Sequence, residues 1–170
     1  MSKKEIKEWF EAIIIALVVA LLIRGFIVEP YIVDGDSMLP TLHDGERLII
    51  DKISYRFSKP DAGEIIVFKY PQNMKLNYIK RVVGIPGDEI YIHDGFVYIN
   101  GILNEESFIA EPTYGTYGPV IVPDNHYFVL GDNRNNSKDS RFSDVGFIPS
   151  NIIKGKPLIR IWPMDTIGLL

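Results

Sequence analysis

The feature that most limits what this chain can fold into is an apolar run near its N-terminus. Residues 12–23 read AIIIALVVALLI and contain no polar side chain. The apolar character continues over residues 9–28, interrupted only by Glu11 and Arg24. A membrane-spanning helix needs about 20 mostly apolar residues. This segment reaches that length if the two charged side chains lie near the interfaces, where long side chains extend to water.

Three interpretations of the segment compete. A cleaved signal peptide fits the basic start and the apolar run, but the next residues, RGFIVEPYIV, offer no small-x-small cleavage site. A buried core helix is the second interpretation. We favour the third, an uncleaved anchor: Lys3, Lys4 and Lys7 would hold residues 1–8 in the cytoplasm by the positive-inside tendency. The chain would then be a single-pass protein of the cell membrane, with everything after Val28 on the extracytoplasmic side.

The composition excludes several functions. The 18 basic and 22 acidic residues give a net charge of −4, so no nucleic-acid partner is predicted. The chain contains no cysteine, which rules out thiolate catalysis, disulfides and Cys-ligated zinc and fits an oxidising extracytoplasmic location. Its three histidines are scattered, without an i, i+4 pair or a carboxylate cluster, so no metal site is expected.

Beyond the apolar run, the pattern changes to short β-rich segments. RLIIDKISYRF, GEIIVFKY and NYIKRVVGIPGD are bounded by Gly, Pro and Asp, and EIYIHDGFVYING has the signature of a hairpin. NHYFVLGDN and PLIRIWP supply further strands, and no long amphipathic helix follows the anchor. The predicted fold class is therefore mainly β: an N-terminal transmembrane helix, then an antiparallel β-sandwich or partly open barrel with a small inserted β subdomain.

The predicted domains follow from these segments. The anchor occupies residues 9–28, and the extracytoplasmic core comprises residues 29–88 together with 124–170. The inserted β subdomain occupies residues 89–123, because the stretch before Pro123 is a looser excursion rich in Gly, Pro, Thr and Tyr.

Directly after the anchor, the stretch VDGDSMLPTL turns sharply and presents one serine, Ser37. A plain turn is one explanation and a nucleophile is the other. A serine nucleophile needs a base, because its hydroxyl is nearly inert at neutral pH. Histidine is the usual base, yet none of His43, His93 and His126 lies in a context that suggests an oriented base. A Ser-His-Asp triad is therefore not favoured.

A neutral lysine is the alternative base, and it requires burial in apolar surroundings. In NYIKRVV, strand alternation places Lys80 and Arg81 on opposite faces, so one basic side chain lies among apolar neighbours unless the strand is at a rim. Only lysine can lose its proton in a protein, so Lys80 is the candidate base. An edge strand with two exposed charges is the simpler alternative.

Three motifs in order after the anchor carry a resemblance. GDSMLPTL, YIKRVVGIPGD and GDNRNNSKDSRF together resemble the bacterial type I signal (leader) peptidases, in their compact single-anchor form. The resemblance implies a membrane-bound serine endopeptidase with a Ser-Lys dyad and no cofactor. It implies that secretory preproteins are cut after a small-x-small motif such as Ala-x-Ala, through an acyl-enzyme. The implied partners are these preproteins and the lipid bilayer, with a position near the secretion translocon.

The same resemblance assigns roles to individual residues. Ser37 matches the nucleophile and Lys80 the general base, while Ser137 matches a hydroxyl that hydrogen-bonds and orients the lysine amine. Asp139 and Arg141 match a pair that holds their loop beside the dyad. An ordinary exposed ion pair, worth less than about 1 kcal/mol, is the alternative for these two residues. Asp132 and Asn133, in the same motif, are interpreted as turn-forming residues.

The oxyanion site departs from the family pattern. Some members place a serine two positions before the nucleophile, and this chain has Gly35 there. The backbone N–H of Ser37 is the remaining candidate donor, and Gly35 is expected to let the backbone approach the substrate. The predicted substrate pocket, for which plain core packing is an equal alternative, consists of Tyr31, Val33, Met38, Leu42 and Ile79.

Two other functions fit parts of the sequence. A membrane-tethered β domain without activity would bind extracytoplasmic partners, but it would not need Ser37, Lys80 and Ser137 together. A self-cleaving repressor with a Ser-Lys pair resembles the core, but it would begin with a DNA-binding segment in place of an apolar anchor. Near the C-terminus, Trp162 is either an aromatic residue at the membrane interface or a core residue.

Overall fold

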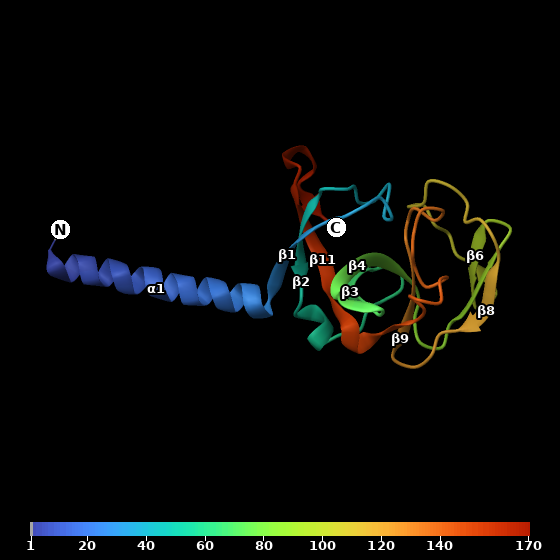
Figure 1. Ribbon diagram of the computed structural model, residues 1–170, viewed down its shortest axis with the longest axis horizontal. Helices are drawn as coiled ribbons and strands as arrows, with labels where there is room; N and C mark the ends of the chain where they lie inside the picture. Colours follow the sequence, from blue (N-terminus) through green and yellow to red (C-terminus); the bar gives the residue numbers. More distant parts are fainter. Residues whose placement is uncertain (1) are drawn as a thin grey trace.

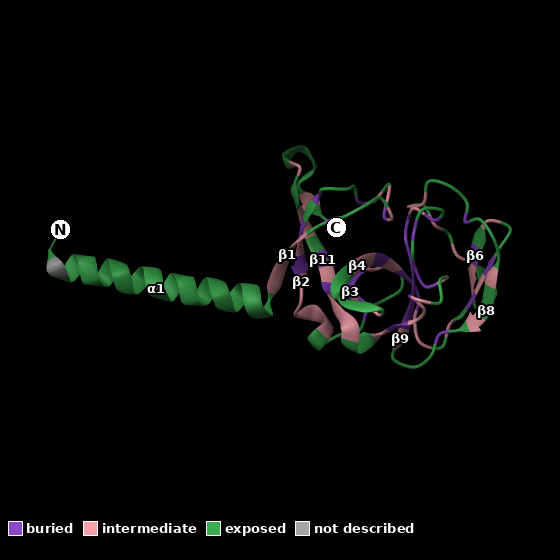
Figure 2. Ribbon diagram, viewed as in Figure 1, coloured by how far each residue is buried: buried purple, intermediate pink, exposed green. Residues whose placement is uncertain are grey.

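The computed structural model describes residues 2–170, with only the backbone of Lys3. It begins with one long helix, α1 (Lys3–Phe26), which Ser2 and Glu5 cap at its N-terminus through a reciprocal pair of hydrogen bonds. The helix projects away from the rest of the molecule (Figure 1), and residues 4–26 are exposed along their whole length (Figure 2). It is long and apolar enough to cross a membrane. The alternative of a buried core helix is therefore excluded.

Eight of the twelve strands in the described residues form one antiparallel sheet. Its strand order is β1-β2-β11-β3-β4-β9-β10, and β12 pairs with β11 at the side. All neighbouring strands pair in antiparallel orientation, as predicted for the β domain. The strands of this sheet are β1 (Val28–Ile32), β2 (Arg47–Asp51), β3 (Ile65–Tyr70), β4 (Asn73–Gly84), β9 (His126–Leu130), β10 (Ile148–Pro149), β11 (Ile153–Trp162) and β12 (Gly168–Leu169).

A second antiparallel sheet has the order β7-β6-β5-β8 and lies at the end of the molecule farthest from α1 (Figure 1). Its strands are β5 (Glu89–His93), β6 (Phe96–Ile99), β7 (Ile102–Leu103) and β8 (Tyr117–Ile121).

The turns of this second sheet follow from the local sequence. Asp94-Gly95 and Asn100-Gly101 each have positive φ at both residues, the geometry that two-residue hairpins favour. All four strands of the sheet lie within residues 89–123, the range predicted as the inserted subdomain; the boundaries of that subdomain stay a prediction.

One predicted strand is shorter than expected. The run RLIIDKISYRF forms β2 only as far as Asp51 and then a short 3-10 helix, η1 (Ser54–Arg56). The Asp51 carboxylate ends the strand because it accepts hydrogen bonds from the N–H groups of Ile53 (2.8 Å) and Ser54 (3.1 Å). Two further 3-10 helices, η2 (Ser150–Ile152) and η3 (Met164–Thr166), flank β11.

The core consists of three apolar clusters. The first cluster packs against the large sheet around Phe68 and Tyr127. The second, around Phe128, packs between the large sheet and the small one. The third lies under the loop between β1 and β2 and contains Val33, Met38, Leu42, Leu48, Ile50 and Val67.

Candidate active site

The loop between β1 and β2 holds Ser37 on top of the third apolar cluster. Met38 and Leu42 are fully buried, and the Leu42 N–H donates to the Met38 carbonyl (3.0 Å), so the turn after Ser37 is fixed from below. Gly35 has φ +87°, a conformation that side chains disfavour, and its N–H donates to the Asp44 carboxylate (2.7 Å). The loop therefore presents Ser37 as a partly exposed residue on a rigid base.

Lys80 lies on β4, between β3 and β9. The strand is central, so the alternative of an edge strand with two exposed charges is excluded. The Lys80 side chain is buried, with 4% exposure, and its Nζ lies 2.6 Å from Ser37 Oγ and 2.8 Å from the Ile79 carbonyl oxygen. The sheet and the β1–β2 loop thus bring together two residues that are 43 positions apart in the chain.

Burial changes the acidity of this lysine. Desolvation lowers the pKa of Lys80 from 10.5 to about 8, against the opposing influence of the Asp139 and Asp132 carboxylates. A substantial fraction of the amine is therefore neutral in mildly alkaline solution. A neutral amine within hydrogen-bond distance of a serine hydroxyl can accept the serine proton.

Ser137 does not make its predicted hydrogen bond. Its Oγ is buried and has no partner within the described residues, so it does not hydrogen-bond the Lys80 amine in this structure. It does lie near the loop that holds Ser37: a Cβ added to Gly131 would come within 2.2 Å of Ser137 Oγ and 2.4 Å of the Ser37 carbonyl oxygen. Only glycine fits at position 131 between these two serines.

The expected ion pair of Asp139 and Arg141 is present. Arg141 donates twice to the Asp139 carboxylate, at 2.8 Å each, and Asp139 also accepts the Gly131 N–H (3.1 Å). Asp139 is fully buried and Arg141 reaches the Arg134 carbonyl (2.6 Å), so the pair joins both ends of the 131–141 loop. It is not the exposed ion pair that was the alternative.

Asp132 and Asn133 do more than form a turn, and here the sequence interpretation was incomplete. Asp132 is buried and accepts two hydrogen bonds from Arg81 (2.8 and 2.6 Å). The Asn133 N–H donates to the Ser37 carbonyl (3.1 Å), and its amide donates to the Asp36 carbonyl (3.0 Å). These contacts connect the strand of Lys80 and the loop of Ser37 to one segment. Charged and amide residues in a turn motif were the only signal in the sequence.

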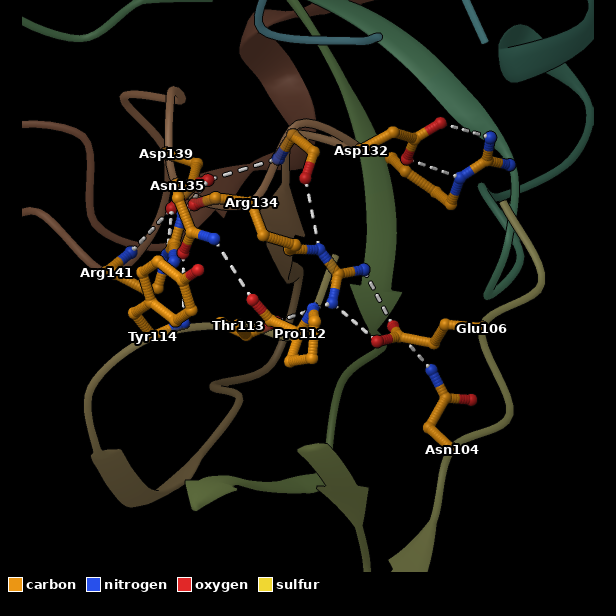
Figure 3. A network of polar contacts seen from close by, with 12 residues as sticks. Asn104, Glu106, Pro112, Thr113, Tyr114, Asp132, Arg134, Asn135, Asp139 and Arg141 are labelled. Atoms are coloured by element: carbon orange, nitrogen blue, oxygen red, sulfur yellow. Dashed lines mark hydrogen bonds and ion pairs between the residues drawn. The ribbon is translucent and has the colours of Figure 1, made fainter. Parts of the chain in front are cut away.

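A third ion pair, between Arg134 and Glu106, connects the same loop to the excursion before β8 (Figure 3). Arg134 is fully buried and makes a two-pronged contact with the Glu106 carboxylate, with 2.7 Å between Nη2 and Oε1. Arg134 Nε also donates to the Gly131 carbonyl (3.1 Å). The Phe108 ring lies near Arg81, 4.0 Å from its guanidinium carbon to the ring centroid. Sequence reasoning missed Arg134 and Glu106, because nothing local pairs residues 28 positions apart.

A cavity of about 480 Å³ opens beside Ser37 and Lys80. Three of the residues predicted for the substrate pocket line it: Tyr31, Val33 and Ile79. Met38 and Leu42 do not line it, because both side chains are enclosed in the cluster beneath the loop. For these two residues the alternative of plain core packing is correct. Further lining residues that were not predicted are Ile32, Asp34, Leu48, Val67, Lys75, Leu76, Asn77, Tyr78 and Lys138.

The remaining candidates lie elsewhere. His43 contacts Glu46 and His126 contacts the Asp124 carbonyl, and no hydrogen bond joins a histidine to Ser37 in the part of the chain that the structure describes. Over residues 2–170, no group of three or more His, Asp or Glu side chains could hold a metal ion. Trp162 is 45% exposed, which excludes the core alternative for it.

Comparisons with known proteins agree with this architecture. The family model described as "Signal peptidase, peptidase S26" matches residues 6–162. The chain therefore belongs to the signal peptidase family, peptidase S26, and is a serine endopeptidase.

Individual relatives are similar over most of their length. The chain is 44% identical to "Probable signal peptidase I-2" of Synechocystis sp., over 95% of this chain and 77% of that protein. It is 41% identical to "Signal peptidase I S" of Bacillus subtilis, over 96% of this chain and 93% of that protein. The crystal structure of a signal peptidase I from Enterococcus faecalis superposes with a TM-score of 0.52 at 32% identity, covering 58% of this chain and 97% of that one.

Proposed function

We propose that this chain is a membrane-anchored endopeptidase that removes signal peptides from secretory preproteins with a Ser37–Lys80 dyad. The observation that carries the proposal is the 2.6 Å separation of Ser37 Oγ and Lys80 Nζ, with the lysine buried on a central strand. The names of the relatives support the substrate class.

The reaction would proceed through an acyl-enzyme. Ser37 Oγ attacks the carbonyl carbon of the scissile peptide bond while its proton passes to the neutral amine of Lys80. The Ser37 N–H would hold the oxyanion of the tetrahedral intermediate; the Gly35 N–H is engaged by Asp44. Lys80 then gives the proton to the leaving nitrogen, the C–N bond breaks, and an ester remains on Ser37.

Deacylation would use the same base. Water attacks the ester carbon, Lys80 takes a proton from the water, and that proton returns to Ser37 Oγ as the acid product leaves. We propose that Asp139 and Arg141 keep the 131–141 loop in place throughout. Ser137, whose buried hydroxyl is unpartnered, would orient the Lys80 amine when the side chains rotate during the reaction.

The cavity beside the dyad would receive the residues before the cut. Its apolar lining from Val33, Leu48 and Val67 favours small uncharged side chains, in line with a small-x-small motif such as Ala-x-Ala. Tyr31 and Ile79 would line the same subsites. No cofactor takes part in this scheme.

The topology is part of the proposal. Of the predicted anchor (9–28), the helical residues 9–26 would span the membrane, because Val28 already pairs with Asp51 in β1. Residues 1–8 would lie in the cytoplasm, and the core (29–88 and 124–170) and the inserted subdomain (89–123) would lie outside. The anchor would keep Ser37, nine residues after Val28, close to the bilayer and to preproteins that emerge near the translocon.

The test is cleavage of a preprotein with an Ala-x-Ala site by the full chain in detergent, with the cut located by mass spectrometry. Cleavage after the last small residue is expected, and Ser37→Ala and Lys80→Ala should be folded but inactive. Ser143→Ala and Lys69→Ala, at two positions outside the dyad, serve as matched controls. If all of these proteins behave alike, the dyad is wrong, and a tethered binding domain becomes the leading function.

A further inference from the structure

A second cavity lies where the anchor enters the β domain. Its volume is about 590 Å³, and it is formed by η1 and the loop after it, the turn before β9, and η2. None of its lining residues is a carboxylate, over the range that the structure describes. We call it the cationic pocket; its charged and amide- or hydroxyl-bearing lining includes Arg56, Ser58, Lys59, Asn125, Ser150 and Asn151.

Direct contacts tie this region to the last turn of α1. The Lys52 N–H donates to the Ile27 carbonyl (2.9 Å), and Lys52 Nζ donates to the Gly25 carbonyl (3.0 Å). The Arg56 guanidinium lies 5.9 Å from the centroid of the Phe26 ring. In Figure 1, η1 is the short teal turn below β2, next to the end of the helix.

These contacts fix the depth of the pocket if α1 spans the membrane. A helix of 24 residues is about 36 Å long, and the hydrocarbon core of a bilayer is about 30 Å thick. Phe26 therefore lies at the membrane–water interface, and Arg56, in contact with it, lies at the level of the lipid headgroups. The cationic pocket cannot be remote from the bilayer surface.

The two basic residues of the pocket are available to bind an anion. Arg56 and Lys59 are exposed, and neither has an ion pair within residues 2–170. Lys52, by contrast, forms an ion pair with Glu29 at 3.2 Å, a carboxylate that it shares with Lys154 at 3.3 Å. Asp61 follows in the same loop but does not line the pocket. The pocket therefore carries two exposed basic side chains outside any ion pair, on a chain whose net charge is −4. Besides burial, the nearby Asp61 carboxylate contributes to the raised pKa values of Tyr55 and Tyr127, which also line the pocket.

An exposed aromatic residue, Phe57, lies between Arg56 and Lys59 in the chain and also lines the pocket. The apolar side chain of Phe57 is 86% exposed. An aromatic ring beside basic side chains is the composition of a surface that lies in a membrane interface, with the ring among acyl chains and the cations at phosphate groups.

We propose that the cationic pocket binds the headgroup of an anionic phospholipid. Arg56 and Lys59 would contact the phosphate, the side chains of Asn125, Ser150 and Asn151 would donate to headgroup oxygens, and Phe57 would enter the acyl region. The bound lipid would hold the β domain at one tilt relative to α1. This inference goes beyond the peptidase function and rests only on the membrane-spanning role proposed for α1.

The experiment measures lipid binding to the full chain in neutral detergent by native mass spectrometry. The probes are phosphatidylglycerol, phosphatidylcholine and inorganic phosphate. The variants are Arg56→Gln, Lys59→Gln and the double variant, and Lys69→Gln on β3 is the matched control because it removes one charge outside the pocket. A basic side chain near an anionic lipid surface contributes about 1 kcal/mol, so each single variant should weaken phosphatidylglycerol binding about fivefold and the double variant about 30-fold.

The control variant should bind phosphatidylglycerol as the parent does, and phosphatidylcholine should bind all the proteins equally and weakly. The proposal is overturned if the double variant retains parental affinity, if the parent does not prefer phosphatidylglycerol, or if inorganic phosphate binds as tightly as the lipid. The single variants guard against misfolding of the double one. Because the readout is lipid binding, an inactive dyad would leave the outcome unchanged.

Discussion

Of the three lysines that line the cavity beside Ser37, Lys80 and Lys138 have surroundings that are alike in one respect. The Lys80 amine lies 5.4 Å from the centroid of the Tyr78 ring, and the Lys138 amine lies 5.4 Å from that of Tyr70. The two tyrosine rings are stacked on each other at 4.6 Å and 8°. The lysines thus occupy the two ends of one aromatic pair.

The pKa values of Lys80 and Lys138 are nevertheless shifted in opposite directions. Lys80 is buried, its nearest partners are a hydroxyl and a carbonyl, and its pKa falls to about 8. The Lys138 side chain is 47% exposed and forms an ion pair with Asp144, whose carboxylate raises the pKa of Lys138 above its usual value. The neighbouring aromatic ring and the cavity therefore do not decide the direction in which the pKa of a lysine shifts. Burial without a carboxylate in contact lowers the pKa, and an ion pair with a carboxylate raises it.

The largest effect should come from making the buried lysine unable to deprotonate. Lys80→Arg keeps the charge but removes the base, and loss of a general base that activates a nucleophile should lower the cleavage rate at least about 10³-fold. Lys138→Arg, the matched change at the exposed lysine, should retain most of the activity. Single-turnover cleavage of an Ala-x-Ala preprotein measures both. Equal losses would mean that the two lysines do not differ in function.

The second prediction concerns stability. Because the folded-state pKa of Lys80 is lower than 10.5, the folded protein disfavours the ammonium form. Lys80→Met should therefore stabilise the fold at pH 7 by up to about 3 kcal/mol, while abolishing activity. Thermal unfolding in detergent provides the measurement.

The sign of the pH dependence of this stabilisation by Lys80→Met follows from thermodynamic linkage. Between pH 8 and 10.5 the unfolded parent binds a proton at Lys80 that the folded parent has lost, so stability of the parent increases with pH in this window. The advantage of Lys80→Met should accordingly shrink from pH 8 to pH 10.5. An advantage that is independent of pH would argue against a lowered pKa.

The third prediction is the pH profile of the reaction. If neutral Lys80 is the base, kcat/KM should rise about tenfold per pH unit below pH 8 and level off above it. The cleavage rate between pH 6 and 9 tests this with the same preprotein. A flat profile across that range would contradict a lysine base.

The smallest effect is expected at the exposed ion pair. Asp144→Asn removes the carboxylate that raises the pKa of Lys138, so this pKa should fall. The cleavage rate and its pH profile should change little, because Asp144 does not contribute to the shifted pKa of Lys80. Titration of the lysine side chains by NMR checks the first part. A displaced rate profile would show that the two lysines are coupled through the stacked tyrosines.

Local sequence was sufficient for much of the fold. The apolar run over residues 9–28 predicts the helix, the Asp94-Gly95 and Asn100-Gly101 pairs predict the hairpins of the second sheet, and alternation in NYIKRVV predicts β4. These features depend on neighbours in the chain, and so they are visible without a structure. The patterns extended too far at η1, where the Asp51 side chain competes with strand pairing. They also extended too far at the end of the apolar run, because the helix ends at Phe26 and Val28 pairs with Asp51 in β1.

The candidate site was predictable in part. Ser37 and Lys80 were selected by their motifs, and the structure places their reactive atoms 2.6 Å apart. Ser137 was selected by the same reasoning, yet its hydroxyl makes no hydrogen bond with the Lys80 amine in the described structure. Met38 was assigned to the pocket because apolar residues near a nucleophile look alike in sequence, whether they face a cavity or the core.

The sequence alone therefore determined which features are available: one apolar run long enough to span a membrane, one turn with a serine, a lysine in an apolar strand, and no cysteine. Only the tertiary structure decided which lysine has a lowered pKa. Lys80 does, because the strand order buries β4 between β3 and β9. The tertiary structure also decided the long-range pairs Arg81–Asp132 and Arg134–Glu106. Desolvation and ion pairing act between groups that are close in space, and distance along the chain does not record them.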